Sequence, residues 1–152
     1  MPLIQVHHAT RADAPDRAPA IAALVTRLAA KVLRKREDLT AVIVTRVDPA
    51  VWYVGGRRLS DLDLASYALE IKVTDGTNTP AEKASFLAAV HAGMGEILGA
   101  LHPESYVHVE EARGDAYGYA GITQARRAYD DIDERDRREH LATAAVARWG
   151  IR

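Results

Sequence analysis

The stretch Met1-Pro2-Leu3-Ile4-Gln5-Val6 opens the chain and decides how the rest is interpreted. A proline in the second position is small enough for the initiator methionine to be removed, which would leave Pro2 as a free secondary amine. The apolar residues that follow predict a strand that starts at the terminus. An interior strand holds its first residue in place, whereas most chain ends fray. We therefore expect a fixed amine capable of acid–base chemistry, although proline is also a common second residue.

The composition is that of one domain of ordinary size, with 152 residues of which 48% are hydrophobic. The formal net charge is −1, so no overall field favours binding to nucleic acid or membrane. The chain has no cysteine, which excludes a disulfide framework, a thiol nucleophile and a cysteine-based zinc site. It has no signal pattern and no apolar run near ~18 residues. We expect a soluble, cytoplasmic protein.

Strands and helices alternate along most of the chain. Period-2 and β-branched runs predict four main strands, at Leu3–His8, Thr40–Val47, Ser66–Val73 and Tyr106–Glu110. Apolar residues at helical spacing predict the face of a first helix, Ile21, Leu24, Val25, Leu28 and Val32. A second helix starts in a capping box at Thr79–Glu82, and its buried stripe is Phe86, Val90, Met94, Ile97 and Leu101.

A shift of 65 residues superposes the two halves without a gap, placing Ile21 on Phe86 and Gly56 on Gly121. Each half is a strand–helix–strand unit, which implies a parallel pair with a right-handed crossover. The prediction is an α/β (α+β) fold, in which two tandem β-α-β units form a four-stranded mixed sheet with both helices on one face. The other face needs a cover, and a symmetric oligomer is the simplest one.

We place this double β-α-β domain at residues 1–125 and a C-terminal helical extension at residues 126–152. Apolar residues near the end of the extension predict a helix that docks on the domain or on a neighbouring subunit; they are Leu141, Ala144, Val146 and Trp149.

The order of these features resembles the tautomerase superfamily. A proline after the methionine, two β-α-β units and a Gly-Gly pair are similar to its double-length macrophage migration inhibitory factor and 5-carboxymethyl-2-hydroxymuconate isomerase types. The segments that carry this likeness are Ala41–Val44, Trp52–Gly56 and His102–Val109. The start, Pro2-Leu3-Ile4-Gln5-Val6-His7, also resembles the single-repeat 4-oxalocrotonate tautomerase type. The resemblance covers about residues 2–122 and leaves the extension outside.

The resemblance implies a homotrimer whose sheets line an inner barrel, with a pocket at each subunit boundary. It implies that Pro2 acts as general base in keto–enol tautomerisation and that no cofactor or metal is needed. The implied substrates are small carboxylates, namely 2-keto or 2-hydroxy-unsaturated acids.

A base of this kind must be neutral, and a free α-amine has a pKa near ~8. Desolvation and a nearby cation both lower that pKa, and the same cation can hold a substrate carboxylate. Lys35 stands where the inhibitory-factor pattern has its pocket lysine, but it also suits the negative end of a helix dipole. Lys72 lies inside a strand, where it needs a partner or a wet cavity; the alternative is a solvated edge. Arg11 is favoured as an exposed loop arginine.

Three further side chains are candidates for substrate binding. Tyr106 and His108 share one face of a strand, near the positions at which relatives place a polar residue that reaches a neighbour's proline. An alternative alignment puts Val107 and Val109 there. Trp52 matches an aromatic wall in relatives, although plain packing explains it equally well.

Two other functions keep the same fold. Hydratases, dehalogenases and decarboxylases of the superfamily add arginines and an acid at places held here by Thr74, Thr77 and Ala116, which argues against them. The third possibility is a non-enzymatic trimeric binding protein, which a retained Met1 would favour because Pro2 would then be acylated. His7 and His8 alternate between the faces of a strand, so they are a poor metal pair.

Overall fold

A computed structural model describes residues 2–149, with the side chains of residues 133, 136, 137 and 140–149 left out. The chain forms two compact units, residues 1–111 and 112–152. From the sequence we placed a boundary after residue 125. No helix in the described part of the chain combines the length and the apolar composition needed to cross a membrane.

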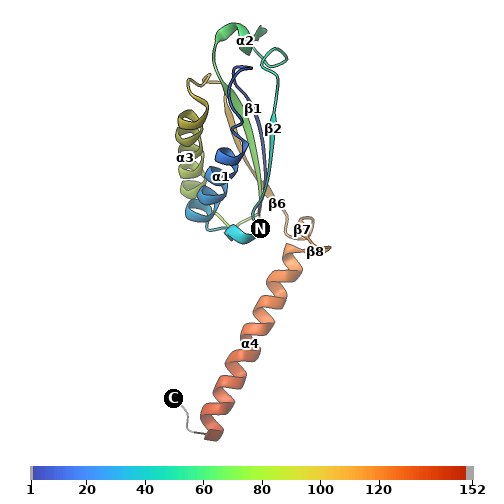
Figure 1. The fold of residues 1–152 in the computed structure, drawn as a ribbon. Helices are drawn as coiled ribbons and strands as arrows, with labels where there is room; N and C mark the ends of the chain where they lie inside the picture. Colours follow the sequence, from blue (N-terminus) through green and yellow to red (C-terminus); the bar gives the residue numbers. More distant parts are fainter. Residues whose placement is uncertain (1, 150–152) are drawn as a thin grey trace. The chain divides into compact units, whose positions relative to one another are not determined.

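The first unit is a mixed four-stranded sheet with the strand order β2-β1-β5-β6 (Figure 1). Its main elements are β1 (Leu3–Ala9), α1 (Ala18–Leu33), β2 (Ala41–Arg46), β5 (Ser66–Thr74), α3 (Pro80–Leu98) and β6 (Tyr106–Ala112). Strand β1 runs parallel to β2 and antiparallel to β5. The shorter elements are η1 (Glu37–Leu39), β3 (Tyr53–Val54), β4 (Arg57–Arg58) and α2 (Leu59–Leu62). This architecture confirms the predicted fold class.

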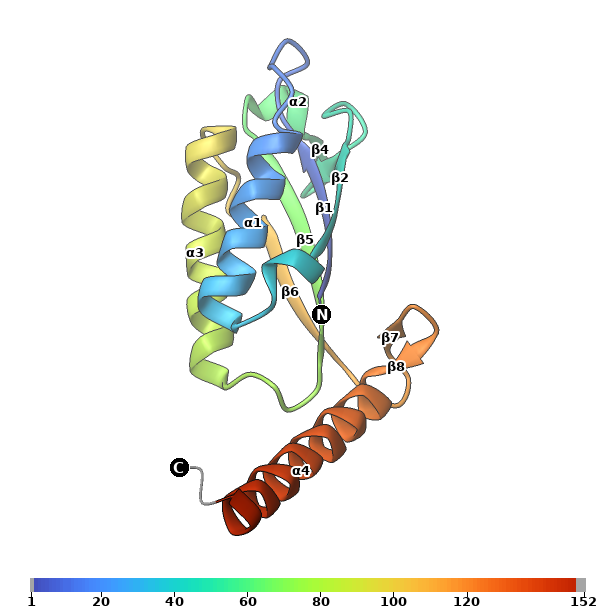
Figure 2. The same cartoon turned by 60° about the horizontal axis from the view of Figure 1, so that its bottom comes forward.

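Helices α1 and α3 lie side by side on one face of the sheet (Figure 2). Side chains alternate along β1, so that Ile4 and Val6 are buried under the helices while His7 on the other face is exposed. The same alternation buries Leu69 and Ile71 of β5. Burial of such side chains stabilises the fold by roughly 1.5–3 kcal/mol each. The uncovered face carries exposed or half-buried side chains.

Helix α3 begins with the predicted capping box, in which the Thr79 hydroxyl accepts from the Glu82 N–H and the Glu82 carboxylate accepts from the Thr79 N–H. The glycines of this helix had no explanation in the sequence alone. The structure explains Gly93, because a Cβ there would lie 2.7 Å from both methyl groups of Leu24 in α1. The absence of a side chain at Gly93 therefore leaves room for Leu24 of the neighbouring helix.

The repeat extends to the hydrogen bonds of two small hairpins. In the first half, the Leu59 N–H donates to the Trp52 carbonyl at 2.8 Å, and 65 residues later the Gln124 N–H donates to the Tyr117 carbonyl at 2.8 Å. The turn residues Gly56 and Gly121 both have a φ of 74°. The predicted internal repeat is therefore present in the backbone as well as in the sequence pattern.

The second unit contains β7 (Gly118–Tyr119), β8 (Ile122–Thr123) and α4 (Gln124–Trp149). The Arg127 guanidinium lies 3.8 Å from the centre of the Tyr119 ring and donates to the Tyr119 carbonyl at 3.1 Å. This contact joins the hairpin to the first turns of α4. The apolar side chains expected to dock this helix, Leu141, Ala144, Val146 and Trp149, lie outside the described side chains, so the docking stays a prediction.

His8 is a buried titratable group on the helix side of β1, with 1% of its surface exposed. Its Nδ1 has no hydrogen-bond partner among the described residues. Burial lowers the pKa of the His8 imidazole, Arg46 lowers it further, and Asp16 opposes the shift. The ring is therefore neutral in the folded protein around neutral pH.

The replacement Gly93→Ala should destabilise the protein. Alanine normally stabilises a helix interior relative to glycine by roughly 0.5–1 kcal/mol, but here its methyl group collides with buried Leu24 and adds an overpacking cost of about 1–3 kcal/mol. Gly95→Ala is the matched control, because its Cβ would meet Leu101 at an ordinary 3.7 Å. Thermal unfolding should give a lower Tm for Gly93→Ala than for Gly95→Ala; the reverse order would contradict the close approach of the helices.

His8 should make the protein sensitive to mild acid. Below the ordinary pKa of 6.5, the unfolded chain binds a proton that the folded chain accepts only at lower pH, so stability falls as the pH drops through this window. Denaturant unfolding from about pH 7.5 to about pH 5 should show a smaller loss for His8→Leu, by on the order of 1 kcal/mol. His7→Leu, a change of the exposed neighbouring histidine, serves as the matched control. Identical slopes for His8→Leu and wild type would contradict the assignment.

Candidate functional site

The start of β1 lies in the interior of the sheet. Pro2 is buried, and its carbonyl accepts a hydrogen bond from the Ala41 N–H at 3.2 Å. The next residue, Leu3, is paired with Ala41 of β2 on one side and Lys72 of β5 on the other. Both neighbouring strands therefore hold the backbone at Pro2, as expected for an interior strand.

Lys35 reaches the same end of the sheet. Its ammonium donates to the Thr77 hydroxyl at 2.8 Å, and that hydroxyl donates to the carbonyl of Thr74, the last residue of β5, at 2.6 Å. Because β5 runs antiparallel to β1, the end of β5 lies beside the start of β1. Pro2 and Lys35 therefore both lie toward this end of the sheet.

The environment of Lys35 favours its neutral form more than water does. Burial lowers the pKa of the Lys35 ammonium, and the neighbouring Arg34 lowers it further, while Glu82 opposes the shift. The backbone is also held, because Arg34 takes a left-handed conformation with φ 56° and the Lys35 N–H donates to the Ala29 carbonyl at 3.0 Å. The amine therefore projects from a fixed helix end.

Buried Asn78 ties that helix end to the loop after β5. Its side-chain amide donates to the carbonyl of Leu33 at 3.0 Å and to the carboxylate of Glu82 at 3.1 Å. Only 8% of Asn78 is exposed, so these bonds are protected from water. The loop that carries Thr77 and the helix that carries Lys35 are thereby held together.

Lys72 has a different environment, on the face of the sheet that the helices leave uncovered. Its ammonium lies 3.3 Å from a carboxylate oxygen of Glu70 and 3.0 Å from one of Glu110. Hydrogen bonds to Glu110 and then Glu70 raise the pKa of Lys72. The expected partner of this strand lysine is thus a pair of carboxylates, which offset its charge and leave it less suited than Lys35 to bind an acid.

Tyr106 and His108 share the uncovered face, as their spacing predicted, and both are exposed. With Gln5, His7 and other residues they line a cavity of about 200 Å³. Tyr106 lies toward the far end of the sheet from Pro2, because Ser66, which pairs with the last residue of β1, bonds to the Glu104 carbonyl just before β6. His108 lies nearer the middle, 3.7 Å from the carboxylate of Glu70, the residue that pairs with Gln5. Within one protomer the structure does not bring them to Pro2.

Trp52 is half-buried and also lies toward the start of β6. It lines a cavity of about 420 Å³ together with Tyr53, Glu104 and Tyr106. The Tyr106 hydroxyl donates to the Glu104 carboxylate, which raises the pKa of the phenol and keeps it protonated at neutral pH. The structure therefore brings Trp52 and Tyr106 together, away from Pro2 and Lys35 of the same protomer.

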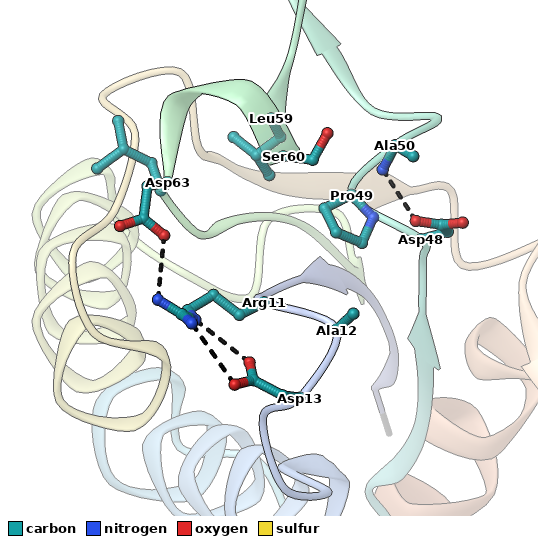
Figure 3. A pocket seen from close by; sticks show the side chains of 10 residues that line it. Arg11, Ala12, Asp13, Asp48, Pro49, Ala50, Leu59, Ser60 and Asp63 are labelled. Carbon is teal, nitrogen blue, oxygen red and sulfur yellow. Dashed lines mark hydrogen bonds and ion pairs between the residues drawn. The ribbon is translucent and has the colours of Figure 1, made fainter.

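A larger cavity of about 690 Å³ lies between the loop after β1, the loop after β2 and α2 (Figure 3). Its cation is Arg11, whose guanidinium lies 3.2 Å from Asp13 and 3.5 Å from Asp63. Arg11 is 69% exposed at its side chain and is already paired with two carboxylates. It therefore fits the expected exposed loop arginine better than a carboxylate-binding group.

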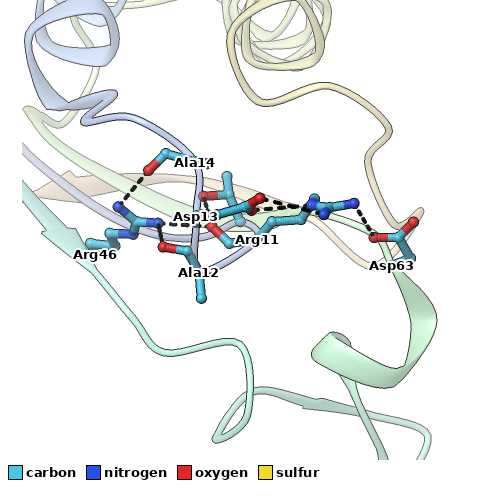
Figure 4. A network of polar contacts seen from close by, with 7 residues as sticks. Arg11, Ala12, Asp13, Ala14, Arg46 and Asp63 are labelled. Atoms are coloured by element: carbon cyan, nitrogen blue, oxygen red, sulfur yellow. Dashed lines mark hydrogen bonds and ion pairs between the residues drawn. The ribbon is translucent and has the colours of Figure 1, made fainter.

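A second arginine shapes the loop beside that cavity (Figure 4). The Arg46 guanidinium donates to three loop carbonyls, those of Arg11 at 2.8 Å, Ala14 at 3.0 Å and Ala12 at 3.2 Å. Its donors are used for the backbone, so Arg46 has a structural role in holding the loop.

The repeat places Tyr67 at the position that corresponds to Pro2. Tyr67 is fully buried, its hydroxyl lies 3.0 Å from Nδ1 of His91, and burial raises its pKa to about 12. The second half thus carries a neutral phenol at the position that corresponds to Pro2.

No group of three or more His, Cys, Asp or Glu side chains among the described residues is arranged to hold a metal ion. His7 is exposed and His8 is buried on the opposite face, as the alternation of a strand requires. Sequence reasoning missed Thr77 as the partner of Lys35, and Glu70 and Glu110 as the partners of Lys72.

No protein-family model and no curated protein matches the sequence significantly. Solved structures do match its fold. A crystal structure of a native fused 4-OT has 19% identity and a TM-score of 0.71, covering 82% of this chain and 97% of that one. A fused 4-OT described as a wild-type symmetric trimer has 16% identity and a TM-score of 0.69, covering 81% and 96%. A macrophage migration inhibitory factor-like protein from Entamoeba histolytica has 18% identity and a TM-score of 0.65, covering 80% and 97%.

Proposed function

We propose that this chain, whose fold is that of the tautomerase superfamily, is a cofactor-independent tautomerase with Pro2 as its general base. The observation that carries the proposal is the buried position of Pro2 between β2 and β5, at the end of the sheet that Lys35 also reaches. Removal of Met1 would make the Pro2 nitrogen a free secondary amine. The substrates would be 2-keto acids or 2-hydroxy-unsaturated acids.

The chemistry needs only this chain's own groups. Neutral Pro2 would take a proton from the enol oxygen, or from a carbon next to the carbonyl, and return it at another position of the conjugated system. The Lys35 ammonium would hold the substrate carboxylate. Burial and this cation would together lower the pKa of the Pro2 amine. Its pKa would then lie closer to the working pH, where a general base is most effective.

We further propose that a homotrimer completes the pocket. In one protomer Trp52, Tyr106 and His108 lie away from Pro2, on or near the uncovered face of the sheet. A neighbouring protomer could present these side chains to Pro2, with Tyr106 or His108 polarising a carbonyl oxygen. Several of the structures with this fold are themselves trimers, which supports this assembly. Lys72 is a weaker candidate for substrate contact because two carboxylates already pair with it.

Pro2→Ala should lower kcat/KM for the ketonisation of phenylenolpyruvate by about 10²–10⁴-fold, because the variant lacks the secondary amine that accepts the proton. The decay of the enol absorbance measures this, after intact mass has established that the wild-type chain lacks Met1. Arg27→Gln, an exposed change on α1, should leave the rate within a few fold. Equal activity of wild type and Pro2→Ala would refute the proposal, and halide release from 3-chloroacrylate without ketonisation would favour a dehalogenase.

Lys35→Gln should raise KM and shift the pH profile, because it removes both the carboxylate partner and the cation that disfavours protonated Pro2. The apparent pKa of Pro2 should rise, so activity lost at neutral pH would partly return at higher pH. Lys31→Gln provides a matched control, as Lys31 is an exposed lysine in the last turn of the same helix. Steady-state kinetics from about pH 6 to about pH 10 would test this. Equal effects of the two substitutions would mean that Lys35 influences activity only through the overall charge of the protein.

A further inference from the structure

Three consecutive cationic residues, Arg34, Lys35 and Arg36, follow the last residue of α1. Their partners differ. Arg34 lies 3.0 Å from a carboxylate oxygen of Glu82, and Arg36 lies 2.6 Å from one of Asp38. Lys35 forms no ion pair with any residue in the described part of the chain; its ammonium donates to the neutral Thr77 hydroxyl at 2.8 Å. The positive charge of Lys35 is therefore held in place without being neutralised.

The Thr77 hydroxyl can hold the Lys35 ammonium in place because it can accept one hydrogen bond and donate another. It accepts from Lys35 and donates to the Thr74 carbonyl at 2.6 Å; the Asn78 amide oxygen lies farther away, at 3.4 Å. When the hydroxyl proton bonds to Thr74, the lone pairs remain for the ammonium. A lysine stem is long and flexible, and a helix-terminal lysine normally samples many rotamers in water.

The Thr74 carbonyl, which fixes this chain of hydrogen bonds (the relay), lies at the Pro2 end of the sheet. Thr74 is the last residue of β5, whose end runs beside the start of β1 at Pro2. Asn78, next to Thr77, bonds to the Leu33 carbonyl at the end of α1, so the loop and the helix keep a fixed separation. The relay thus spans 42 residues of sequence and joins the end of a helix to the end of a strand.

We propose that Thr77 is a positioning residue that holds the unpaired Lys35 ammonium at the Pro2 end of the sheet, ready for one carboxylate of the substrate. This inference rests on the proposed function, because Lys35 is there the group that binds the acid. A neutral partner is essential to it: a carboxylate in place of the hydroxyl would position the amine equally well but would cancel its charge. Thr77 itself does not touch the reacting atoms.

Three variants separate positioning from packing. Thr77→Val keeps the shape but removes the acceptor, Thr77→Ser keeps the hydroxyl, and Thr77→Asp supplies a competing negative charge. Thr74→Val is the matched control, because only the backbone carbonyl of Thr74 takes part in the relay. Thr77→Ala serves as a second test should Thr77→Val fail to fold.

The first measurement is the ketonisation of phenylenolpyruvate. Thr77→Val should raise KM about tenfold with kcat within about twofold, the effect of losing one hydrogen bond to a charged group. Thr77→Ser should restore KM, and Thr77→Asp should raise it at least as much as Thr77→Val. Thr74→Val should behave as wild type. Wild-type KM in both Thr77→Val and Thr77→Ala, while Pro2→Ala is inactive, would overturn the inference and leave the proposed function standing.

The second measurement does not depend on turnover. An NMR titration of the Lys35 side chain should give a lower pKa in Thr77→Val than in wild type, because the ammonium loses its acceptor, and Thr77→Ser should restore it. Binding of 3-phenylpropionate, a non-reactive monocarboxylate, should weaken about tenfold in Thr77→Val. If wild type shows no ketonisation but these two shifts remain, the role of Thr77 stands and the tautomerase proposal fails. Unchanged titration and unchanged binding would refute the role of Thr77.

Discussion

The pairing of β1 with strands on both sides is the constraint on which the rest of the structure depends. A chain end normally loses its order within a few residues, but here β2 and β5 pair with β1 along its whole length. The backbone next to Pro2 is therefore paired on both sides. The proposed role of Pro2 would depend on this, because proton transfer requires the reacting atoms to be held in a fixed geometry.

The two halves of the chain share a backbone plan but differ in the charges that they carry. The repeat places Tyr67 at the position of Pro2, and Tyr67 is buried and neutral. The 65-residue shift places Ala100 on Lys35, so the second half has no cation at that position. The repeat thus supplies two similar frameworks, and only the first carries the residues that the proposed function requires.

The fold could be predicted from sequence because its signals are local or periodic: alternation in the strands, the capping box at Thr79 and the 65-residue repeat. The site could be predicted only in part. The resemblance suggested Lys35, but its partner Thr77 lies 42 residues away and no pattern connects the two. Glu110 meets Lys72 through the register of neighbouring strands, and Gly93 is explained only by Leu24 of another helix. Such contacts depend on tertiary packing, and no short spacing pattern in a single sequence predicts them.

Each of the two small hairpins is followed by a helix, and the hydrogen bonds at this junction do not limit the length of the helix. The backbone bonds that start α2 after Trp52 are repeated at the start of α4 after Tyr117. In the first copy the helix is a single turn, because β5 must begin soon afterwards, whereas in the second copy it runs through residue 149. The length of the helix is thus independent of the bonds that nucleate it. An appendage of this kind can be acquired, lengthened or exchanged during evolution without disturbing the register of any strand.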